Sequence, residues 1–285
     1  MGEVLPGDSA DTLGITNAQD LLQVTPTDTA LELTQATPAV PKAPGLYYES
    51  LKNYGRTFAR VVPNTAREAK AQLQEMSALG VKQLYVTSDG SPYGKAIAQA
   101  VRSDASGSGV TIASAASGAD GAFVGAADVA FASRTFASLA GSNPSLKLFG
   151  PSALDTPALT TGLSSATGKL NLYVSSPGFL PNELSASGQK FVTDFHAAYG
   201  HAPAPSAIFG YEAVAAVLDI LHQAGTAANN RSTVVKDFFG IRNRDSVLGR
   251  YSITQATGDT NLGAYVFLRL RGNALIPFKS VTVQG

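Results

Sequence analysis

The chain has 285 residues, of which 44% are hydrophobic and 15% are charged, enough for one large core or two of ordinary domain size. Lys plus Arg and Asp plus Glu number 21 each, so no net positive field exists to hold a nucleic acid. The residues include no cysteine, which excludes disulfides, thiolate metal sites and cysteine nucleophiles from them.

The first residues carry acids where a signal peptide has a basic segment followed by an apolar run, so we expect no export signal in them. No apolar run approaches the roughly 20 residues that cross a bilayer. In chain order, residues 21–24 predict a strand that ends in the hydroxyl-rich loop 25–29. Residues 54–63 predict a second strand, and the pattern from 64 to 80 predicts a helix.

The middle of the chain alternates strand and helix patterns. Residues 81–86 predict a buried strand that leads through the polar loop 87–94 into a helix at 95–102. Residues 105–121 show no periodicity and receive no prediction. Further strands are expected at 122–129, 146–149 and 171–175, with a helix around 134–139. This alternation predicts an α/β fold with a mostly parallel sheet.

The last third begins with two amphipathic helix patterns, at 187–199 and 211–224. The prolines of 200–205 between them suit a stiff crossing, and we place a domain boundary there. Residues 249–253 and 265–270 predict two strands.

Signals of catalysis are missing. His196, His201 and His222 lie apart without a matching carboxylate set, so we expect solvated surface histidines and no metal. The GxSxG, GxxxxGK[ST] and GxGxxG patterns are absent. We expect a chain that is not an enzyme and needs no cofactor.

Two loops follow predicted strands, where open parallel sheets bind ligands. Tyr93 in loop 87–94 offers a ring and a hydroxyl, although an ordinary turn with one partly exposed tyrosine explains the pattern equally well. Loop 25–29 offers clustered hydroxyls and backbone NH groups for a carboxylate, and an ordinary helix cap is the favoured alternative there.

Several short segments stand in a distinctive order and spacing. They are GE at 2–3, ITN at 15–17, LQVTP at 22–26, LT at 33–34, RTFARVVP at 56–63, DGSPYGK at 89–95, GP at 150–151, GYEA at 210–213 and VLG at 247–249. In these segments the chain resembles, nearly end to end, the type I periplasmic solute-binding proteins that serve ABC transporters for branched-chain amino acids.

The resemblance implies two Rossmann-like lobes with parallel sheets, joined by three crossing strands, that close on a solute held between them. Residues 1–63 with 206–248 would form a partial first lobe, and residues 64–205 with 249–285 would form the second. The crossings would fall at 56–63, 206–210 and 249–253.

The resemblance also implies ligand-binding residues. Thr27 and Thr29 match the family's strand-end loop, Tyr93 matches the tyrosine of its Asp-to-Tyr-Gly turn, and Phe131 falls near its second aromatic position. Thr27, Thr29 and Tyr93 are therefore expected to line one cleft.

Two positions depart from the family. Its carboxylate-binding serine falls on Pro6, and the acid that would meet a ligand ammonium falls on Ser152, which we still expect to contact the ligand. Losing such a charged partner costs about 1.5–3 kcal/mol. We therefore expect a small amino-acid-like, amide or aromatic solute, with uncharged or weakly polar solutes favoured over a tightly bound branched-chain amino acid.

Family members carry an export signal and several strand–helix units ahead of the segment that matches residues 2–3. The first lobe would thus be N-terminally truncated, and its open sheet edge favours a homo-oligomer. The expected function is solute capture in the periplasm or outside the cell for an ABC transporter permease. The alternatives are the ligand-binding domain of a sensor, a truncated interaction module that binds no solute, and an amide-hydrolase-like enzyme, for which Asp89 and Asp128 are the only acids near the site.

Overall fold

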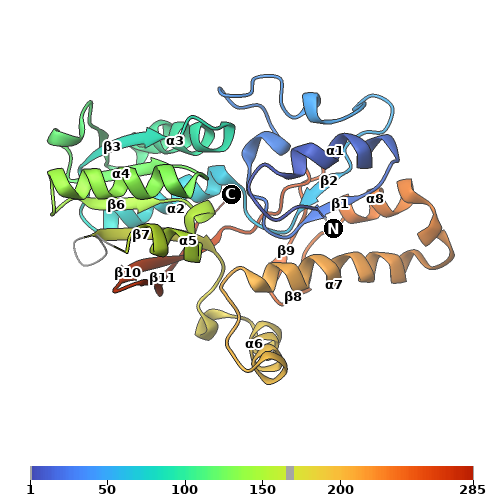
Figure 1. The fold of residues 1–285 in the computed structure, drawn as a ribbon. Coiled ribbons are helices and arrows are strands. Elements are labelled where there is room, and N and C mark those ends of the chain that lie inside the picture. The colour runs from blue at the N-terminus through green and yellow to red at the C-terminus, as the bar shows by residue number, and fades with distance from the viewer. Residues whose placement is uncertain (1, 165–169, 285) are drawn as a thin grey trace. The chain divides into compact units, whose positions relative to one another are not determined.

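The computed structural model describes residues 2–164 and 170–284, and the chain divides into two compact units (Figure 1). Unit 1 comprises Met1–Asn64, Gly178–Gly263 and Gln284–Gly285, and unit 2 comprises Thr65–Pro177 and Ala264–Val283. The first division follows the expected boundary after residue 63 closely. The other two differ from the expectation, because residues 178–205 and 249–263 belong to unit 1.

The differences have a local cause. Residues 206–210 do not form a crossing strand, because helix α7 (Ala207–Ala224) begins there and packs Phe209 into the core of unit 1. Residues 249–253 do not cross either, since β9 (Gly249–Tyr251) pairs with β8 (Arg244–Ser246) inside unit 1. The chain instead returns to unit 2 at β10 (Ala264–Arg271).

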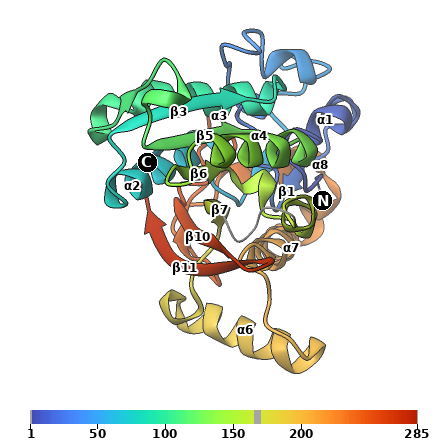
Figure 2. The same ribbon diagram turned by 60° about the vertical axis from the view of Figure 1, so that its left-hand side comes forward.

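Unit 2 is built on a seven-stranded sheet in the order β11-β10-β7-β6-β5-β3-β4. Its parallel part consists of β3 (Gln83–Ser88), β4 (Thr111–Ile112), β5 (Gly121–Gly125), β6 (Lys147–Gly150) and β7 (Asn171–Pro177). The strands β10 and β11 (Ala274–Thr282) run antiparallel at one end of the sheet, as Figure 2 shows. The expected parallel α/β sheet is confirmed, with an antiparallel addition from the end of the chain.

Helices cover both faces of this sheet. The helices α2 (Thr65–Ala78) and α3 (Pro92–Asp104) pack on one face over Phe123 and Phe149, while α4 (Val129–Ser142) and α5 (Pro157–Gly162) pack on the other over Val124 and Leu148. Side chains of one strand alternate between the faces, so each strand contributes to both cores. The parallel strands are accordingly buried on both sides.

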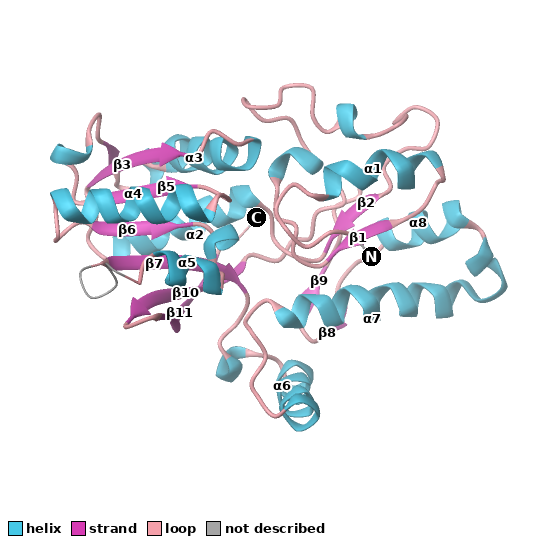
Figure 3. Cartoon of the chain, viewed as in Figure 1, coloured by secondary structure: helices cyan, strands magenta, loops and turns pink. Residues whose placement is uncertain are grey.

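Unit 1 holds a two-stranded parallel sheet of β1 (Gln23–Thr25) and β2 (Phe58–Arg60), with Val24 opposite Ala59. Figure 3 shows the short strands and the helices of this unit, which are α1 (Ser9–Ala18), α6 (Ala186–Tyr199), α7 and α8 (Arg231–Phe239). Their core gathers Val24, Ala59, Phe209 and Phe238. With so few strands, most of the apolar burial in unit 1 comes from helices and loops.

Candidate functional site

In unit 2 the parallel strands end at one edge of the sheet, and polar loops follow them. The loop after β3 carries Asp89, whose carboxylate accepts hydrogen bonds from the backbone NH of Ser91 (2.9 Å), Ala127 (2.9 Å) and Asp128 (3.1 Å). Burial by itself raises the pKa of Asp89, but a hydrogen bond from the Ser91 hydroxyl at 2.6 Å and these NH groups outweigh it and lower the pKa below its usual value. Asp89 therefore joins the loops after β3 and β5 as a structural anion.

The start of α3 lies close to the end of β5. Ser91 caps the helix by accepting a hydrogen bond from the NH of Gly94 at 3.0 Å, and Pro92 occupies its first turn. A Cβ atom at Gly94 would lie 2.6 Å from the carbonyl oxygen of Gly125 and would collide with the Asp89 carboxylate. Only glycine permits this approach, which sets the position of the neighbouring Tyr93.

Tyr93 is buried in the first turn of α3, with 3% of its surface exposed, instead of standing in an open turn. Its hydroxyl hydrogen-bonds to Glu68, which lies fully buried in α2. The ring can therefore offer only a small edge to a solute, and its hydroxyl is tied to an acid that the sequence pattern did not indicate.

Ser152 meets the same acid. Its backbone NH donates to Glu68 Oε1 at 2.5 Å and its hydroxyl donates to Oε2 at 3.0 Å. The hydroxyl of Ser175 in β7 donates to Oε1 at 2.6 Å and in turn accepts a hydrogen bond from Gln72 at 2.7 Å. The structure thus brings Tyr93 and Ser152 together on one carboxyl group, which we call the Glu68 cluster: Glu68, Gln72, Tyr93, Ser152 and Ser175.

None of the five side chains of the Glu68 cluster is positively charged. Burial raises the pKa of Glu68, and the hydrogen bonds from Ser175, Ser152 and Tyr93 lower it only in part. Asp155 lies three residues beyond Ser152, and burial raises its pKa too, against a hydrogen bond with Ser176. Both acids at this edge of the sheet are thereby driven toward their neutral forms.

Phe131 lies in the first turn of α4, where its NH donates to Asp128 Oδ1 at 3.0 Å. Its ring is half-buried against the core formed with Val124 and Phe136. Phe131 therefore keeps part of an apolar ring accessible near the end of β5.

In unit 1, the loop after β1 satisfies its own polar groups. The Thr25 hydroxyl accepts from the NH of Thr27 (3.3 Å) and of Asp28 (3.0 Å) and donates to the carbonyl of Glu3, while the Thr27 hydroxyl donates to the carbonyl of Val4 at 2.8 Å. The expectation of free NH groups here is wrong at these positions, because a threonine hydroxyl already accepts from them. Thr29 is buried next to Asp28.

The carboxyl group of Asp28, a residue of the loop after β1, lies at the N-terminus of α1. Its carboxyl oxygens accept hydrogen bonds from the NH of Gly7 (2.8 Å), Ser9 (3.0 Å) and Ala30 (3.1 Å). Burial raises its pKa, opposed in part by the charge of Arg60 and by these NH groups. A helix N-terminus attracts anions, so the chain's own carboxyl group fills a position where a ligand carboxylate would otherwise bind.

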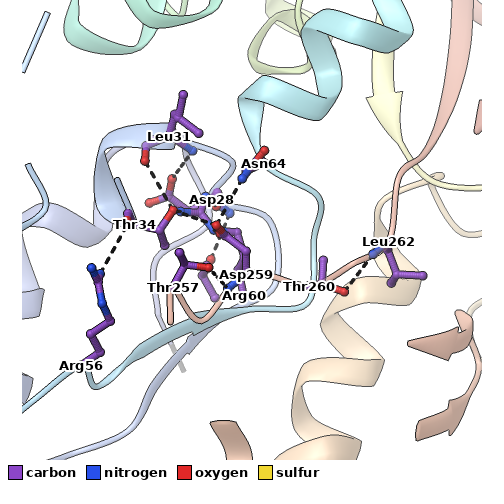
Figure 4. Close-up of polar contacts among 12 residues, drawn as sticks. Asp28, Leu31, Thr34, Arg56, Arg60, Asn64, Thr257, Asp259, Thr260 and Leu262 are labelled. Atoms are coloured by element: carbon purple, nitrogen blue, oxygen red, sulfur yellow. Dashed lines mark hydrogen bonds and ion pairs between the residues drawn. The ribbon is translucent and has the colours of Figure 1, made fainter. Parts of the chain in front are cut away.

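Arg60 forms the centre of a second polar cluster in unit 1 (Figure 4). Its Nε lies 2.8 Å from Asp259 Oδ1, and its terminal nitrogens donate to the carbonyl of Asp28 (2.9 Å) and the hydroxyl of Thr34 (3.2 Å). Thr34 and Asn64 also donate to Asp259 Oδ2, at 3.1 and 3.3 Å. This Arg60 cluster joins β2 to the segment after β9.

Two further kinds of feature were sought in the described residues, a metal site and a membrane-spanning helix. Across 2–164 and 170–284, no three histidine or acidic side chains gather closely enough to hold a metal ion. Across the same residues, no helix is both long and apolar enough to cross a membrane.

Solved structures define the class of this fold, a type I periplasmic binding protein. The leucine-binding protein LivK from Thermotoga maritima is 17% identical, with a TM-score of 0.75 over 98% of this chain and 78% of its own. The branched-chain amino acid binding protein LivJ from Streptococcus pneumoniae, in complex with isoleucine, is 15% identical (TM-score 0.72; 100% and 78%). A solute-binding protein from R. palustris in complex with benzoate is 16% identical (TM-score 0.70; 100% and 78%).

A family model described as periplasmic binding protein matches residues 17–273, so the chain belongs to the periplasmic binding protein family. No curated protein matches the chain. The resemblance found in the sequence is confirmed.

Sequence reasoning missed Glu68, Gln72 and Ser175. Glu68, Gln72 and Glu75 recur at helical spacing on one face of α2, a pattern that normally indicates a solvated face. Here β7, β10 and β11 cover that face, and Lys279 of β11 pairs with Glu75 at 2.6 Å. The available sequence signal was the spacing of these three polar residues beside small alanines, and only the tertiary structure shows that this face of α2 is buried.

The expectation that Thr27, Thr29 and Tyr93 line one cleft joins residues of both units and stays a prediction.

Proposed function

We propose that this protein captures a small solute in the periplasm or outside the cell and delivers it to an ABC transporter permease. The family match over residues 17–273 carries this proposal, supported by the similar folds of a leucine-binding protein and of binding proteins in complex with isoleucine and with benzoate. The ligand-binding domain of a sensor would use the same binding chemistry and differs in its partner. The proposal assigns no catalytic residue.

We further propose that the solute is uncharged or weakly polar and carries an apolar or aromatic portion. A zwitterion leaves water only if the protein replaces the hydrogen bonds of both its charges. In unit 1, the Asp28 carboxyl group accepts hydrogen bonds from the NH groups of Gly7 and Ser9 at the start of α1, and in unit 2, burial raises the pKa of Glu68 and of Asp155. These groups are therefore poor partners for the carboxylate and the ammonium of a zwitterion.

In unit 2 the solute would contact Phe131, Ser152 and the small exposed edge of Tyr93. In unit 1 the match of Thr27 and Thr29 to the family's strand-end loop makes that loop the proposed contact. The half-buried ring of Phe131 supplies apolar surface. The hydroxyl of Ser152, which the buried Glu68 orients, has lone pairs left to accept a hydrogen bond from an amide or hydroxyl.

Isothermal titration calorimetry against branched-chain amino acids, aliphatic amides, aromatic amides and aromatic acids tests this proposal. We expect one of the amides or aromatic solutes to bind, and we expect Phe131→Ala to weaken that binding while Ile15→Ala, an exposed residue of α1, leaves it unchanged. Binding that survives Phe131→Ala and Ser152→Ala together would remove the assigned contacts. No binding by a folded chain to any solute would favour the interaction-module alternative, and hydrolysis of an amide during the titration would favour the enzyme.

A further inference from the structure

The two oxygens of the Glu68 carboxyl group have different surroundings. Oε1 accepts the backbone NH of Ser152 at 2.5 Å and the hydroxyl of Ser175 at 2.6 Å, which occupies both of its lone pairs. The direction of the second bond is fixed, because Gln72 donates to Ser175 at 2.7 Å and to the carbonyl of Gly150 at 2.8 Å. A proton bound by Glu68 therefore lies on Oε2.

Two hydroxyl groups besides that of Ser175 contact the Glu68 carboxyl group. That of Tyr93 lies in the buried first turn of α3, and that of Ser152 lies 3.0 Å from Oε2 in a half-buried loop after β6. A hydroxyl that accepts a hydrogen bond from the protonated Oε2 must point its own hydrogen elsewhere, and a buried hydrogen needs a buried acceptor. Ser152 can point its hydrogen toward solvent or a solute, so Ser152 is the favoured acceptor.

The direction of the hydrogen bond between Ser152 and Oε2 depends on the charge of Glu68. When Glu68 is ionised, Ser152 donates to Oε2 and presents only lone pairs to a solute. When Glu68 is protonated, Oε2 donates to Ser152 across the same 3.0 Å, and the hydroxyl hydrogen of Ser152 is free to donate. Ser152 thus changes from an acceptor into a donor when Glu68 binds one proton.

The elements packed around Glu68 carry other charged or titratable side chains: Arg67 and Glu75 of α2, Tyr93 of α3, Asp155 of the loop after β6, Tyr265 of β10 and Lys279 of β11. Glu75 and Lys279 pair with each other at 2.6 Å, and Asp155 hydrogen-bonds to Ser176 instead of Glu68. Burial raises the pKa of Glu68, and hydrogen bonds from uncharged groups oppose only part of this effect. Protonation of Glu68 is therefore favoured by its burial.

We propose that Glu68 is a positioning residue: when protonated it makes Ser152 donate a hydrogen bond to a carbonyl oxygen of the solute, and when ionised it withdraws that donor. This inference rests on the proposed function, in which Ser152 contacts the solute, and it narrows the solute to one that presents a carbonyl oxygen there. Such a solute binds the protonated form more tightly. Binding therefore takes up a proton, and it weakens as pH rises and Glu68 ionises.

Calorimetric titration with 5-methylhexan-2-one tests the switch, because this ketone accepts hydrogen bonds, donates none and does not titrate. Between about pH 5 and about pH 9 we expect its dissociation constant for the wild-type chain to rise about tenfold. The matched control is Glu68→Gln, whose Oε1 still accepts and whose Nε2 donates to Ser152 at every pH, so its dissociation constant should not change over this range. Ser152→Ala should bind the ketone weakly at both pH values. Circular dichroism confirms that the variants fold.

The backbone NH of Ser152 reports the charge of Glu68 without any solute, because it donates to Oε1. Its NMR chemical shifts should move between about pH 5 and about pH 9 in the wild-type chain and stay constant in Glu68→Gln. Constant shifts in the wild-type chain, or a pH dependence of ketone binding that survives in Glu68→Gln, would overturn the switch. If the Ser152 signal titrates but neither the ketone nor 4-methylpentanamide binds at either pH, the proposed function itself fails, and Ser152 donates to no solute.

Discussion

The two units bury acidic side chains in opposite ways. In unit 1, Asp259 faces the guanidinium of Arg60 at 2.8 Å, so a charge meets a charge. In unit 2, Glu68 receives only hydroxyl and backbone NH groups, from Ser152, Ser175 and Tyr93. The raised pKa of Glu68 follows from this difference, because hydrogen bonds without a cation offset only part of the cost of burying a carboxylate.

The Arg60 cluster has a structural role, whereas the Glu68 cluster lies where a solute could bind. The Arg60 cluster closes on itself, since Asp259 and Thr34 bind each other as well as the arginine, and Asn64 donates to Asp259. The Glu68 cluster ends in Ser152, a half-buried residue at the carboxyl edge of the sheet. We therefore expect changes in unit 1 to affect mainly stability, and changes at Glu68 to affect both stability and solute binding.

The largest effect is expected for Arg60→Met. Removing one partner of a buried ion pair leaves Asp259 uncompensated, which should cost unit 1 about 3–5 kcal/mol in the free energy of unfolding. Urea denaturation followed by circular dichroism measures the loss. In the double variant Arg60→Met with Asp259→Asn the loss should be smaller than the sum of the single losses, and simple additivity would contradict the ion pair.

A smaller loss is expected for Glu68→Ala, about 1–3 kcal/mol, because Ser175 and the Ser152 NH lose their buried acceptor. Glu68→Gln should lose much less, since a neutral amide keeps one acceptor and one donor where the protonated acid has them. The same urea titration compares the two variants. Equal losses in both would show that Glu68 acts as an anion.

The pH dependence of stability isolates the raised pKa of Glu68. As pH rises above about 4.5, the unfolded chain releases this proton while folded unit 2 retains it, so the contribution of Glu68 to stability falls until pH passes its folded pKa. Glu68→Gln has no such proton. The free energy of unfolding of Glu68→Gln minus that of wild type should therefore increase from about pH 4 toward pH 8. A difference that is flat or decreases over this range would contradict the neutral acid.

The smallest effect is expected for Lys190→Met on α6. Lys190 and Asp194 form an exposed pair four residues apart, in which solvent screens the attraction. Thermal unfolding should show no resolvable change in midpoint, in contrast to the buried pair in unit 1. A drop comparable with that of Arg60→Met would show that exposure does not decide the worth of these ion pairs.

Most of the fold could be predicted, because long periodic segments and their caps are local signals. The pattern from 64 to 80 matched α2, and the loop 87–94 led into α3 as expected. The strand β4 was missed because it has two residues inside a Gly- and Ser-rich stretch. The strand β11 was missed because Pro277 interrupts its pattern next to a register shift. Its pairing with β10 depends on tertiary structure.

The candidate site could be predicted only in part. Tyr93 and Ser152 were found through motif positions, and both contact Glu68. Their common partner was not found, because a glutamate on a helix normally faces solvent, whereas this one is buried and takes its partners from three other segments of unit 2. The sequence also did not predict that the Asp28 carboxyl group lies at the N-terminus of α1, because its hydrogen bond with the NH of Gly7 joins two loops that are distant in sequence.

The central claim is that the protein prefers an uncharged solute over the zwitterion of the same shape. Leucine and 4-methylpentanamide share one apolar portion, and the amide carries neither ammonium nor carboxylate. Calorimetric titration of the wild-type chain with both compounds compares them directly. The account predicts that the amide binds at least about tenfold more tightly than leucine. Tighter binding of leucine, above all with a submicromolar dissociation constant, would contradict it.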